Sequence, residues 1–368
     1  MPDATPSPRP PAAAAGAVAG AAGAAGAASA GEELSGLFRG TGDEHALKDA
    51  RSGAGIAVTS VPAFVAGAEL ADLADSDGRV VVLTADLAHA NRTIDFASRH
   101  PGRFFNVGVA EQNMVSIAAG MASAGLMPFA ATFAAYVALL ACEQIRTDCA
   151  YPGMPVRILA HHSGMSLGFY GTSHHSLEDL GVMRTIADLT VVCAADANQL
   201  RAILRASLSH PGPMYIRLGR GRDPQVYPEP PPDFQIGKAV RLTEGSDLAM
   251  ITTGSQVHAC MAAAGRLAAS GISARVIDMH TISPLDKAEI LAAASQTAAL
   301  LTVEEHNITG GLGSAVAETL ADAGLAVRLL RHGVPDQHVL LGPPAALYAH
   351  YRLDAPGIEA TAMQLLGR

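Results

Sequence analysis

Aromatic and charged side chains are scarce in this chain of 368 residues. Tryptophan is absent, aromatic residues make up 4% and charged residues 16%, whereas about a quarter of an ordinary globular protein is charged. Without large rings, the cores have to be built from Ala, Val, Leu and Met, within an apolar share of 49%. So apolar a composition also fits a chain that buries much of its surface against a partner.

Other absences exclude whole classes of function. Basic runs are missing, and 25 Lys and Arg against 34 Asp and Glu give a net charge of −9, which argues against nucleic acid as the main ligand. No run of about 18 strongly apolar residues occurs, so no membrane span is expected. The four cysteines show neither a CxxC pair nor a zinc spacing, so we predict no metal site on this chain. Buried free thiols in the cytoplasm are the expectation for Cys142, Cys149, Cys193 and Cys260.

The N-terminal residues 1–45 are predicted to be a disordered tail. As far as Ala30 they are nearly all Ala, Gly, Pro and Ser, which cannot bury enough apolar surface to offset the entropy of ordering. Two alternatives stay open for this segment. It could be a signal peptide ending at Ala28-Ser29-Ala30, or a linker left from a fused N-terminal half.

Beyond the tail, short apolar runs alternate with helical patterns. Residues 80–84 and 156–160 read as buried strands, and residues 109–124 and 197–209 as helices. Such alternation predicts a parallel sheet that is covered by helices on both faces.

A second series of the same kind runs from a strand at residues 248–253 to a strand at residues 326–330. Between the two series, the motif PEPPPD predicts an interdomain linker at residues 227–234. We therefore predict an α/β protein of two three-layer domains with mainly parallel sheets, over residues 50–226 and 235–368.

The segment GVAEQNM, residues 108–114, places one acid at the predicted start of a helix. Met114, Ile117 and Met121 recur after it at helical spacing. A helix start tolerates a carboxylate, whereas Val, Asn, Met and Ala around Glu111 leave it poorly hydrated. An acid in this setting can share a proton with a ring nitrogen.

With its other motifs, the chain resembles the C-terminal half of a transketolase, in the split form in which two genes carry the two halves. The likeness spans residues 64–366, which contain TADLAHAN, PFAATFAAY, GTSHHSLEDLGVMRTI, MYIRLGRGR, VIDMHTISPLD and LTVEEHNITGGLGSAVAE. The resemblance implies a pyrimidine-binding domain that binds thiamine diphosphate, followed by a transketolase C-terminal domain. The implied reaction is transfer of a two-carbon ketol unit from a ketose phosphate to an aldose.

The resemblance also assigns residues to the cofactor. Glu111 matches the acid that hydrogen-bonds a pyrimidine ring nitrogen and so activates the cofactor. Phe133 matches the ring that stacks on the pyrimidine, and Tyr136 lies on the same helical face. Asp86 matches a position near the cofactor and the subunit interface, and His89 follows it on the same loop as a weaker candidate.

Substrate contacts are implied in the loop after the strand at residues 156–160. His174 matches a histidine that contacts the sugar hydroxyl and carbonyl oxygens, and His175 is a second candidate. Arg220 matches an arginine that binds the substrate phosphate. Tyr170 stands where transketolases usually carry an acid, so an altered substrate is expected.

Two features of the family are missing. A second phosphate-binding arginine is expected where the chain has Val61, so phosphorylation of the substrate stays open. Nor does the chain contain the GDG motif through which the family holds the diphosphate and Mg²⁺. The resemblance therefore implies an N-terminal transketolase subunit that carries this motif, binds Mg²⁺ and shares the cofactor within a heterotetramer.

Two other functions compete with this interpretation. One is the beta subunit of a 2-oxoacid dehydrogenase, which shares the architecture, as does deoxyxylulose phosphate synthase. The other is a non-catalytic subunit that only assembles a partner. His280 and residues 304–306 are expected to make domain and subunit contacts, and residues 310–318 to begin a structural helix.

Overall fold

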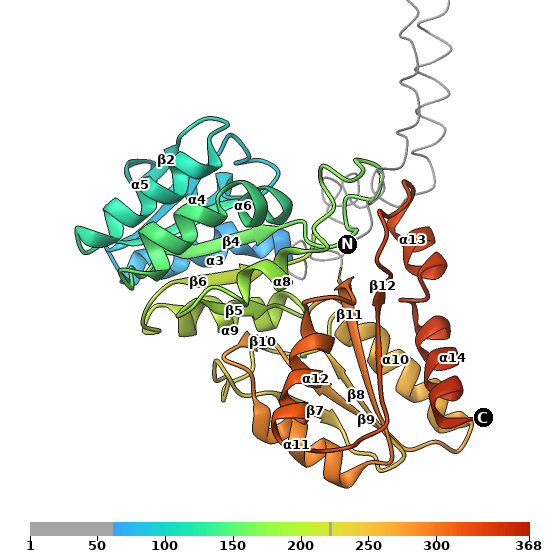
Figure 1. Cartoon of the computed structure of the whole chain (residues 1–368). Helices are drawn as coiled ribbons and strands as arrows, with labels where there is room; N and C mark the ends of the chain where they lie inside the picture. Colours follow the sequence, from blue (N-terminus) through green and yellow to red (C-terminus); the bar gives the residue numbers. More distant parts are fainter. Residues whose placement is uncertain (1–61, 221–222) are drawn as a thin grey trace, which may run out of the picture. The chain divides into compact units, whose positions relative to one another are not determined.

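The computed structural model describes residues 62–220 and 223–368 of the chain (Figure 1). The predicted tail at residues 1–45 and the position of Val61 lie outside this part. Within it, the strands form two sheets, one of seven strands and one of five. None of the described helices is long and apolar enough to cross a membrane.

The larger sheet has its strands parallel except at one edge. In spatial order, they are β10 (Thr281–Ser283), β5 (Thr190–Cys193), β6 (Met214–Arg217), β4 (Arg157–His161), β3 (Met127–Phe133), β1 (Val80–Thr84) and β2 (Phe104–Asn106). Only β10 and β5 pair antiparallel. Because β10 comes after the first strands of the smaller sheet in sequence, the second domain contributes an edge strand to the first sheet.

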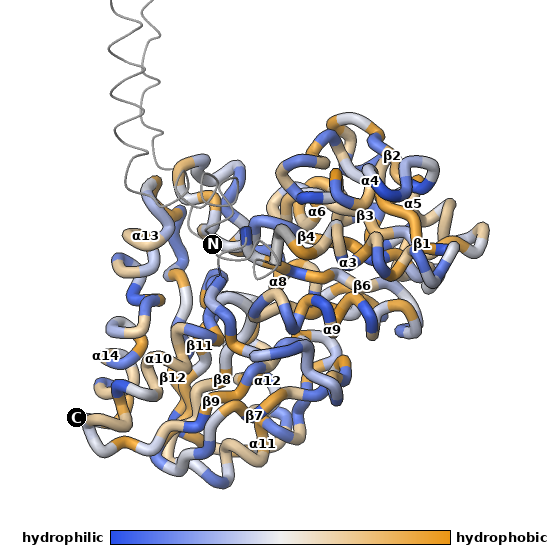
Figure 2. Tube along the Cα trace, turned by 180° about the vertical axis from the view of Figure 1, so that it is seen from behind, coloured by the Kyte–Doolittle hydropathy of each residue, from blue (hydrophilic) through white to orange (hydrophobic). Residues whose placement is uncertain are grey.

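Helices pack on both faces of this sheet. They are α3 (Pro62–Ser76), α4 (Ile94–Arg99), α5 (Glu111–Ser123), α6 (Ala134–Leu140), α7 (Cys142–Gln144), α8 (Asp179–Met183) and α9 (Ala197–Ser207), with a short 3-10 turn η2 (Pro101–Arg103) and a π-helix η3 (Ile145–Ala150). Residues of α3, α4 and α9 form one core with the sheet, and residues of α5, α6 and α8 form the other. The strands between them are apolar throughout, as the orange colour of β1 illustrates (Figure 2).

The smaller sheet is also covered on both faces. Its spatial order is β12 (Leu329–Val334), β11 (Leu300–Asn307), β8 (Leu248–Thr252), β9 (Ala274–Asp278) and β7 (Val240–Thr243), with only β7 antiparallel to its neighbour. Its helices are α10 (Gln256–Ala269), α11 (Lys287–Gln296), α12 (Leu312–Asp322), α13 (Pro344–His350) and α14 (Ala355–Leu366). Helices α10, α13 and α14 share one core with the sheet, and α11 and α12 share the other. The predicted fold class, two three-layer α/β domains with mainly parallel sheets, is confirmed.

Some elements differ from the prediction. The single helix expected at residues 134–150 is divided into α6, α7 and η3, and Asp148 within η3 accepts a hydrogen bond from the Ser116 hydroxyl of α5 over 2.6 Å. The strands β7 and β10 and the helices α13 and α14 were not predicted. For α14 a signal was present, because Asp354 caps the helix at the Gly357 amide and a proline occupies its first turn.

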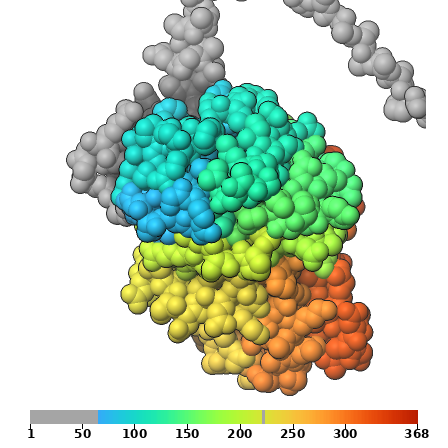
Figure 3. Space-filling model, turned by 90° about the vertical axis from the view of Figure 1, so that its left-hand side faces the viewer, coloured from blue at the N-terminus to red at the C-terminus, as the bar shows by residue number. Residues whose placement is uncertain are grey.

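A chain segment between the sheets joins the two domains. In Figure 3 the surface around α9 and β7, yellow-green to yellow, lies between the blue-to-green part and the orange part. Asp278, at the end of β9, accepts hydrogen bonds from the Tyr227 hydroxyl at 2.7 Å and the Gln199 amide at 2.6 Å. Burial raises the pKa of Asp278 to about 7, and nearby Asp196 adds to the rise. The first domain, the linker and the second domain therefore meet at one buried carboxyl group.

The loop from β4 to α8, residues 162–178, is held by the second domain, and we call it the histidine loop. Its two ends pair with each other, because Gly164 and Ser176 exchange backbone hydrogen bonds of 3.0 Å. The Glu305 carboxylate of β11 accepts the Met165 amide at 2.6 Å. Further along, the amides of Gly342 and Asn307 donate to the carbonyl groups of Gly168 and Leu177. The loop conformation thus depends on backbone contacts with the second domain.

Replacing Gly168 by alanine tests this close contact. A Cβ atom at Gly168 would lie 2.2 Å from the Gly342 carbonyl oxygen, so backbone would have to move. We expect Gly168→Ala to lower the free energy of unfolding by about 1–3 kcal/mol, the usual cost of overpacking. Urea denaturation of the full chain measures the change.

The matched control is Gly265→Ala, in the exposed part of α10, where an added Cβ meets nothing within 4 Å. This change is expected to raise the free energy of unfolding by about 0.5–1 kcal/mol, because alanine favours helix over glycine. Equal stability of the two variants would show that the histidine loop tolerates movement away from Gly342.

Replacing Asp278 by asparagine tests the buried carboxyl group. The pKa of Asp278 is about 7 in the folded chain and about 3.9 in an unfolded one. Between these values the unfolded chain releases a proton that the folded chain retains, so Asp278 lowers stability as the pH rises. We expect Asp278→Asn to be more stable relative to wild type at pH 8 than at pH 4, as measured by urea denaturation. The control is Asp322→Asn, at an exposed carboxylate, and equal pH dependence of wild type and Asp278→Asn would contradict the assignment.

Candidate active site

The carboxyl ends of β1 and β2 are joined by side-chain hydrogen bonds. Asn106, the last residue of β2, accepts the amides of Asp86 and Gly108 at 3.0 and 3.1 Å, and donates to the Asp86 carboxylate at 3.0 Å. Asp86 and Gly108 both have positive φ, which suits Asp and Gly better than most residues. Asp86 itself is exposed, as is His89 on the same loop. This network fixes the chain just before α5.

Glu111 is the first residue of α5 and is buried, with 7% of its surface exposed. The Thr132 hydroxyl of β3 donates to it over 3.4 Å, which is a long hydrogen bond. The amino end of the helix favours its negative charge. Glu111 is therefore a buried acid whose described hydrogen bond is weak, and it retains capacity to bind a polar group.

Phe133, next to Thr132, ends β3 and turns the chain into α6. Its ring lies 4.5 Å from the His162 ring and 5.6 Å from the Tyr136 ring, between centroids. The structure thus brings Phe133 and Tyr136 together on the first turn of α6, beside the strand that contacts Glu111.

His162 is a residue that the sequence analysis missed. It follows β4 in left-handed backbone conformation, with φ of 58°, and is buried. Burial lowers its pKa to about 2, helped by nearby His161 and Arg220, so its imidazole is neutral. Its Nδ1 atom has no hydrogen-bond partner among the described residues. The sequence signal was a histidine pair directly after a buried strand, but its unusual φ cannot be read from sequence.

His174 has hydroxyl groups at both ring nitrogens. The Tyr136 hydroxyl lies 2.8 Å from Nε2, and the Ser173 hydroxyl lies 2.9 Å from Nδ1. The Tyr170 ring flanks the imidazole at 4.9 Å between centroids. Burial lowers the pKa of His174, so that its neutral form predominates near pH 7. The histidine loop thereby brings Tyr170 and His174 to the rings of α6.

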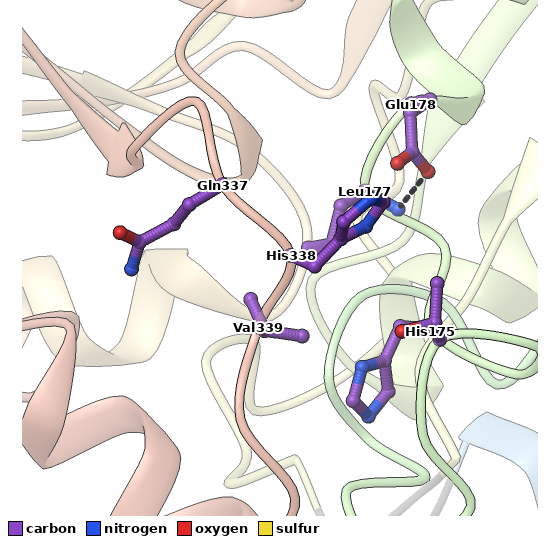
Figure 4. A pocket seen from close by; sticks show the side chains of 7 residues that line it. His175, Leu177, Glu178, Gln337, His338 and Val339 are labelled. Carbon is purple, nitrogen blue, oxygen red and sulfur yellow. Dashed lines mark hydrogen bonds between the residues drawn. The ribbon is translucent and has the colours of Figure 1, made fainter. Parts of the chain in front are cut away.

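His175 points away from this group, into a separate small cavity. The cavity measures about 20 Å³ and is also lined by Glu178 and, from the second domain, by residues 337–339 (Figure 4). That volume holds about one water molecule. The cavity is too small for a sugar, and burial lowers the pKa of His175.

The two arginines after β5 and β6 differ in their surroundings. Arg217 is buried and forms an ion pair with Asp179, 2.7 Å between Nε and Oδ2. Burial alone would raise the pKa of Asp179, but the guanidinium group outweighs it and holds the pKa below its ordinary value. Arg220 is exposed, and its charge reaches His162. Of the two, Arg220 is the one placed to meet a ligand from solvent.

Acidic residues of β11 contact the first domain and α12. Glu305 accepts the hydroxyls of Ser255 and Tyr348 at 2.7 and 2.8 Å, besides the Met165 amide. Burial raises the pKa of Glu305. Glu304 accepts the amides of Leu312 and Gly313, so the start of α12 is already satisfied by a carboxylate. His306 contacts the Gly181 amide at 3.2 Å, and the His280 carbonyl accepts the Cys193 amide at 2.7 Å.

The described residues fit the aminopyrimidine of thiamine diphosphate. A buried carboxyl group with spare hydrogen-bonding capacity suits a ring nitrogen, and the Phe133 ring offers an apolar face for stacking. The unpartnered Nδ1 of His162 adds a polar atom beside that ring. Among the described residues, no group of three His, Cys, Asp or Glu side chains could hold a metal ion.

Comparison with known proteins identifies the family. Residues 63–224 match the transketolase pyrimidine-binding domain, and residues 237–358 match the transketolase C-terminal domain. One of the two subunits of the apulose-4-phosphate transketolase of Phocaeicola vulgatus is 38% identical, over 81% of this chain and 95% of that protein. The 6-deoxy-6-sulfo-D-fructose transketolase subunit SqwH of a Clostridium species is also 38% identical, over 81% of this chain and 92% of the relative.

A solved structure gives the same answer. The structure of a split gene transketolase, described as an inactive beta4 tetramer, has a TM-score of 0.76 and 39% identity, and the match covers 83% of this chain and 98% of that one. The pyrimidine-binding domain marks a family that depends on thiamine diphosphate. Sequence, fold and site agree, and the chain belongs to the transketolase family, as the C-terminal section of a split enzyme.

Proposed function

We propose that this chain is the cofactor-activating subunit of a transketolase that moves a two-carbon ketol unit from a ketose phosphate to an aldose. The observation that supports it most is one group of side chains. A buried acid, Glu111, lies beside the strand end that carries Phe133, and the neutral imidazole of His174 lies 6.0 Å from the same ring.

In this proposal, each residue has a distinct task. Glu111 holds a proton at a ring nitrogen of the aminopyrimidine, and Phe133 and Tyr136 orient that ring and exclude water from one side. Thiamine diphosphate, when bound, supplies the nucleophilic carbon that takes up the ketol unit. His174 binds the substrate oxygens and exchanges protons with them, since a neutral imidazole both donates and accepts. Asp86, linked through Asn106 to the loop before Glu111, borders the cofactor.

The diphosphate group and Mg²⁺ are assigned to another chain. This chain carries no GDG motif. Relatives named as subunits, and a relative described as inactive in its beta4 form, support a two-chain enzyme with the cofactor between its chains. We propose a heterotetramer with an N-terminal transketolase subunit, in the reducing cytoplasm that four free cysteines suit.

The substrate site is proposed to lie along the histidine loop. Arg220 is exposed and so can meet a phosphate group, and His175 supports the loop from its cavity. Tyr170, with 61% of its surface exposed, stands where an acid is usual, so a non-standard sugar is the proposed donor. The two relatives named above are described with unusual sugars, which shows how far the donor varies among split transketolases.

The domain limits follow the same proposal. We assign residues 50–226 to the pyrimidine-binding domain, residues 227–234 to the linker and residues 235–368 to the C-terminal domain. The family matches at residues 63–224 and 237–358 lie within these limits. The strand β10 pairs with the first sheet although its sequence position is in the second domain.

Replacing Glu111 by glutamine tests the central role. Glutamine keeps the shape but cannot hold a proton at the pyrimidine nitrogen. We expect the Glu111→Gln chain, reconstituted with its partner, to lose about 10²-fold or more of its ketol transfer rate. Steady-state kinetics measure the loss, and calorimetry measures cofactor binding.

The matched control is Glu143→Gln, which removes an exposed carboxylate paired with Arg146. This variant is expected to keep the wild-type rate. Unchanged ketol transfer by Glu111→Gln would instead favour the non-catalytic assembly subunit.

Replacing Arg220 by methionine tests phosphate recognition. A hydrogen bond to a charged group contributes about 1.5–3 kcal/mol, so we expect KM for a phosphorylated ketose to rise about tenfold or more. KM for the same ketose without phosphate is expected to stay unchanged. Arg266→Met, at an exposed arginine paired with Glu359, serves as the control. An equal change in KM for both sugars would remove Arg220 from the phosphate site.

A further inference from the structure

The hydrogen bonds of His174 form a continuous chain of three side chains. Tyr136 lies at one end, on the first turn of α6 and 5.6 Å from the Phe133 ring. Ser173 lies at the other end and is exposed. The imidazole joins them, with 2.8 Å at Nε2 and 2.9 Å at Nδ1. The chain therefore runs from solvent to the pocket that contains Glu111.

The protonation states of this chain follow from its surroundings. Burial lowers the pKa of His174, so the imidazole is neutral, with one nitrogen that donates and one that accepts. Burial, and then the charge of Glu111, raise the pKa of Tyr136, so its hydroxyl keeps its proton. When Nε2 accepts from Tyr136, Nδ1–H has to donate to Ser173. The other tautomer reverses both hydrogen bonds.

The rings around His174 hold it in this position. The Tyr170 ring lies 4.9 Å and the Phe133 ring 6.0 Å from the imidazole centroid. Both hydroxyls therefore stay within hydrogen-bond distance while the tautomer changes. A change of tautomer then moves one proton along the chain and leaves no charge behind.

We propose that Ser173, His174 and Tyr136 form a proton relay between solvent and the substrate pocket, with the Tyr136 hydroxyl at the reacting oxygen. This inference rests on the proposed transketolase function. As the donor ketose is cleaved, its hydroxyl O–H bond breaks and Tyr136 Oη receives that proton. Tyr136 gives its own proton to His174 Nε2, Nδ1–H gives its proton to Ser173 Oγ, and Ser173 releases its proton to water.

The second half of the reaction reverses the relay. The carbonyl oxygen of the acceptor aldose becomes a hydroxyl and so needs one proton. Water protonates Ser173, and the proton transfers run back through His174 to Tyr136. Over a full turnover no proton is gained or lost, as transfer of a ketol unit requires.

The test uses Tyr136→Phe in the full chain together with its partner subunit. Phenylalanine keeps the ring but removes the hydroxyl. We expect kcat for ketol transfer to fall about 10²-fold with KM nearly unchanged, because positioned proton transfer contributes about 10²–10⁴-fold. The solvent deuterium isotope effect on kcat and the pH profile of kcat should change with it. Tyr151→Phe, which removes a fully exposed hydroxyl, is the matched control.

A second variant and a second readout keep the test decisive. Ser173→Ala alters an exposed residue and should also lower kcat, by about tenfold, with the same loss of isotope effect. In the full chain without partner or cofactor, ¹⁵N spectra of the histidines, assigned with His174→Gln, should show a changed His174 tautomer in both variants. Wild-type kcat and isotope effect in Tyr136→Phe would overturn the relay, as would an unchanged His174 spectrum. Absence of ketol transfer in the wild-type pair would instead overturn the proposed function.

Discussion

The hydrogen bonds of one buried carboxylate, Glu305, hold the part of the chain on which the site depends. The histidine loop contains no helix or strand of its own, so its shape has to come from its neighbours. Glu305 binds its backbone at Met165, and the Ser255 and Tyr348 hydroxyls orient the carboxylate. Hydrogen bonds that involve a charged group are about twice as strong as neutral ones. A side chain of the second sheet thus determines where the first domain presents His174.

The buried ion pair of Arg217 and Asp179 completes this junction. Arg217 also donates to the carbonyl groups of Ser176 and Glu305, at 3.0 Å each. It therefore joins the end of β6, the end of the histidine loop and β11. Removing one partner of such a pair leaves an uncompensated buried charge, which costs about 3–5 kcal/mol. The second domain is consequently part of the site's framework, although Glu111 and Phe133 lie in the first.

The regular elements could be predicted because their cores are local in sequence. The bounds of β1, β5 and β9 agree with the apolar runs, since every residue of these strands is buried. The strand β10 has only three residues and exists through its pairing with β5, so no local pattern predicts it. In the site, Glu111, Phe133 and His174 were found by their motifs. His162 and the hydroxyl contacts of His174 were not, because backbone strain and contacts between distant loops appear only after folding.

Exposure around Glu111 bears on how the site is completed. Glu111 is buried, yet Val109, two residues earlier, has 81% of its surface exposed, and Tyr170 and Leu341 are exposed at 61% and 66%. Apolar side chains that surround a buried acid lose little by binding another surface and gain about 25 cal/mol for each Å² that they remove from water. The same binding would exclude water from the relay end at Tyr136 while Ser173 keeps its access to solvent. The proposed shared pocket therefore needs the partner for two reasons, since it would both complete the cofactor site and dry the side where protons are exchanged.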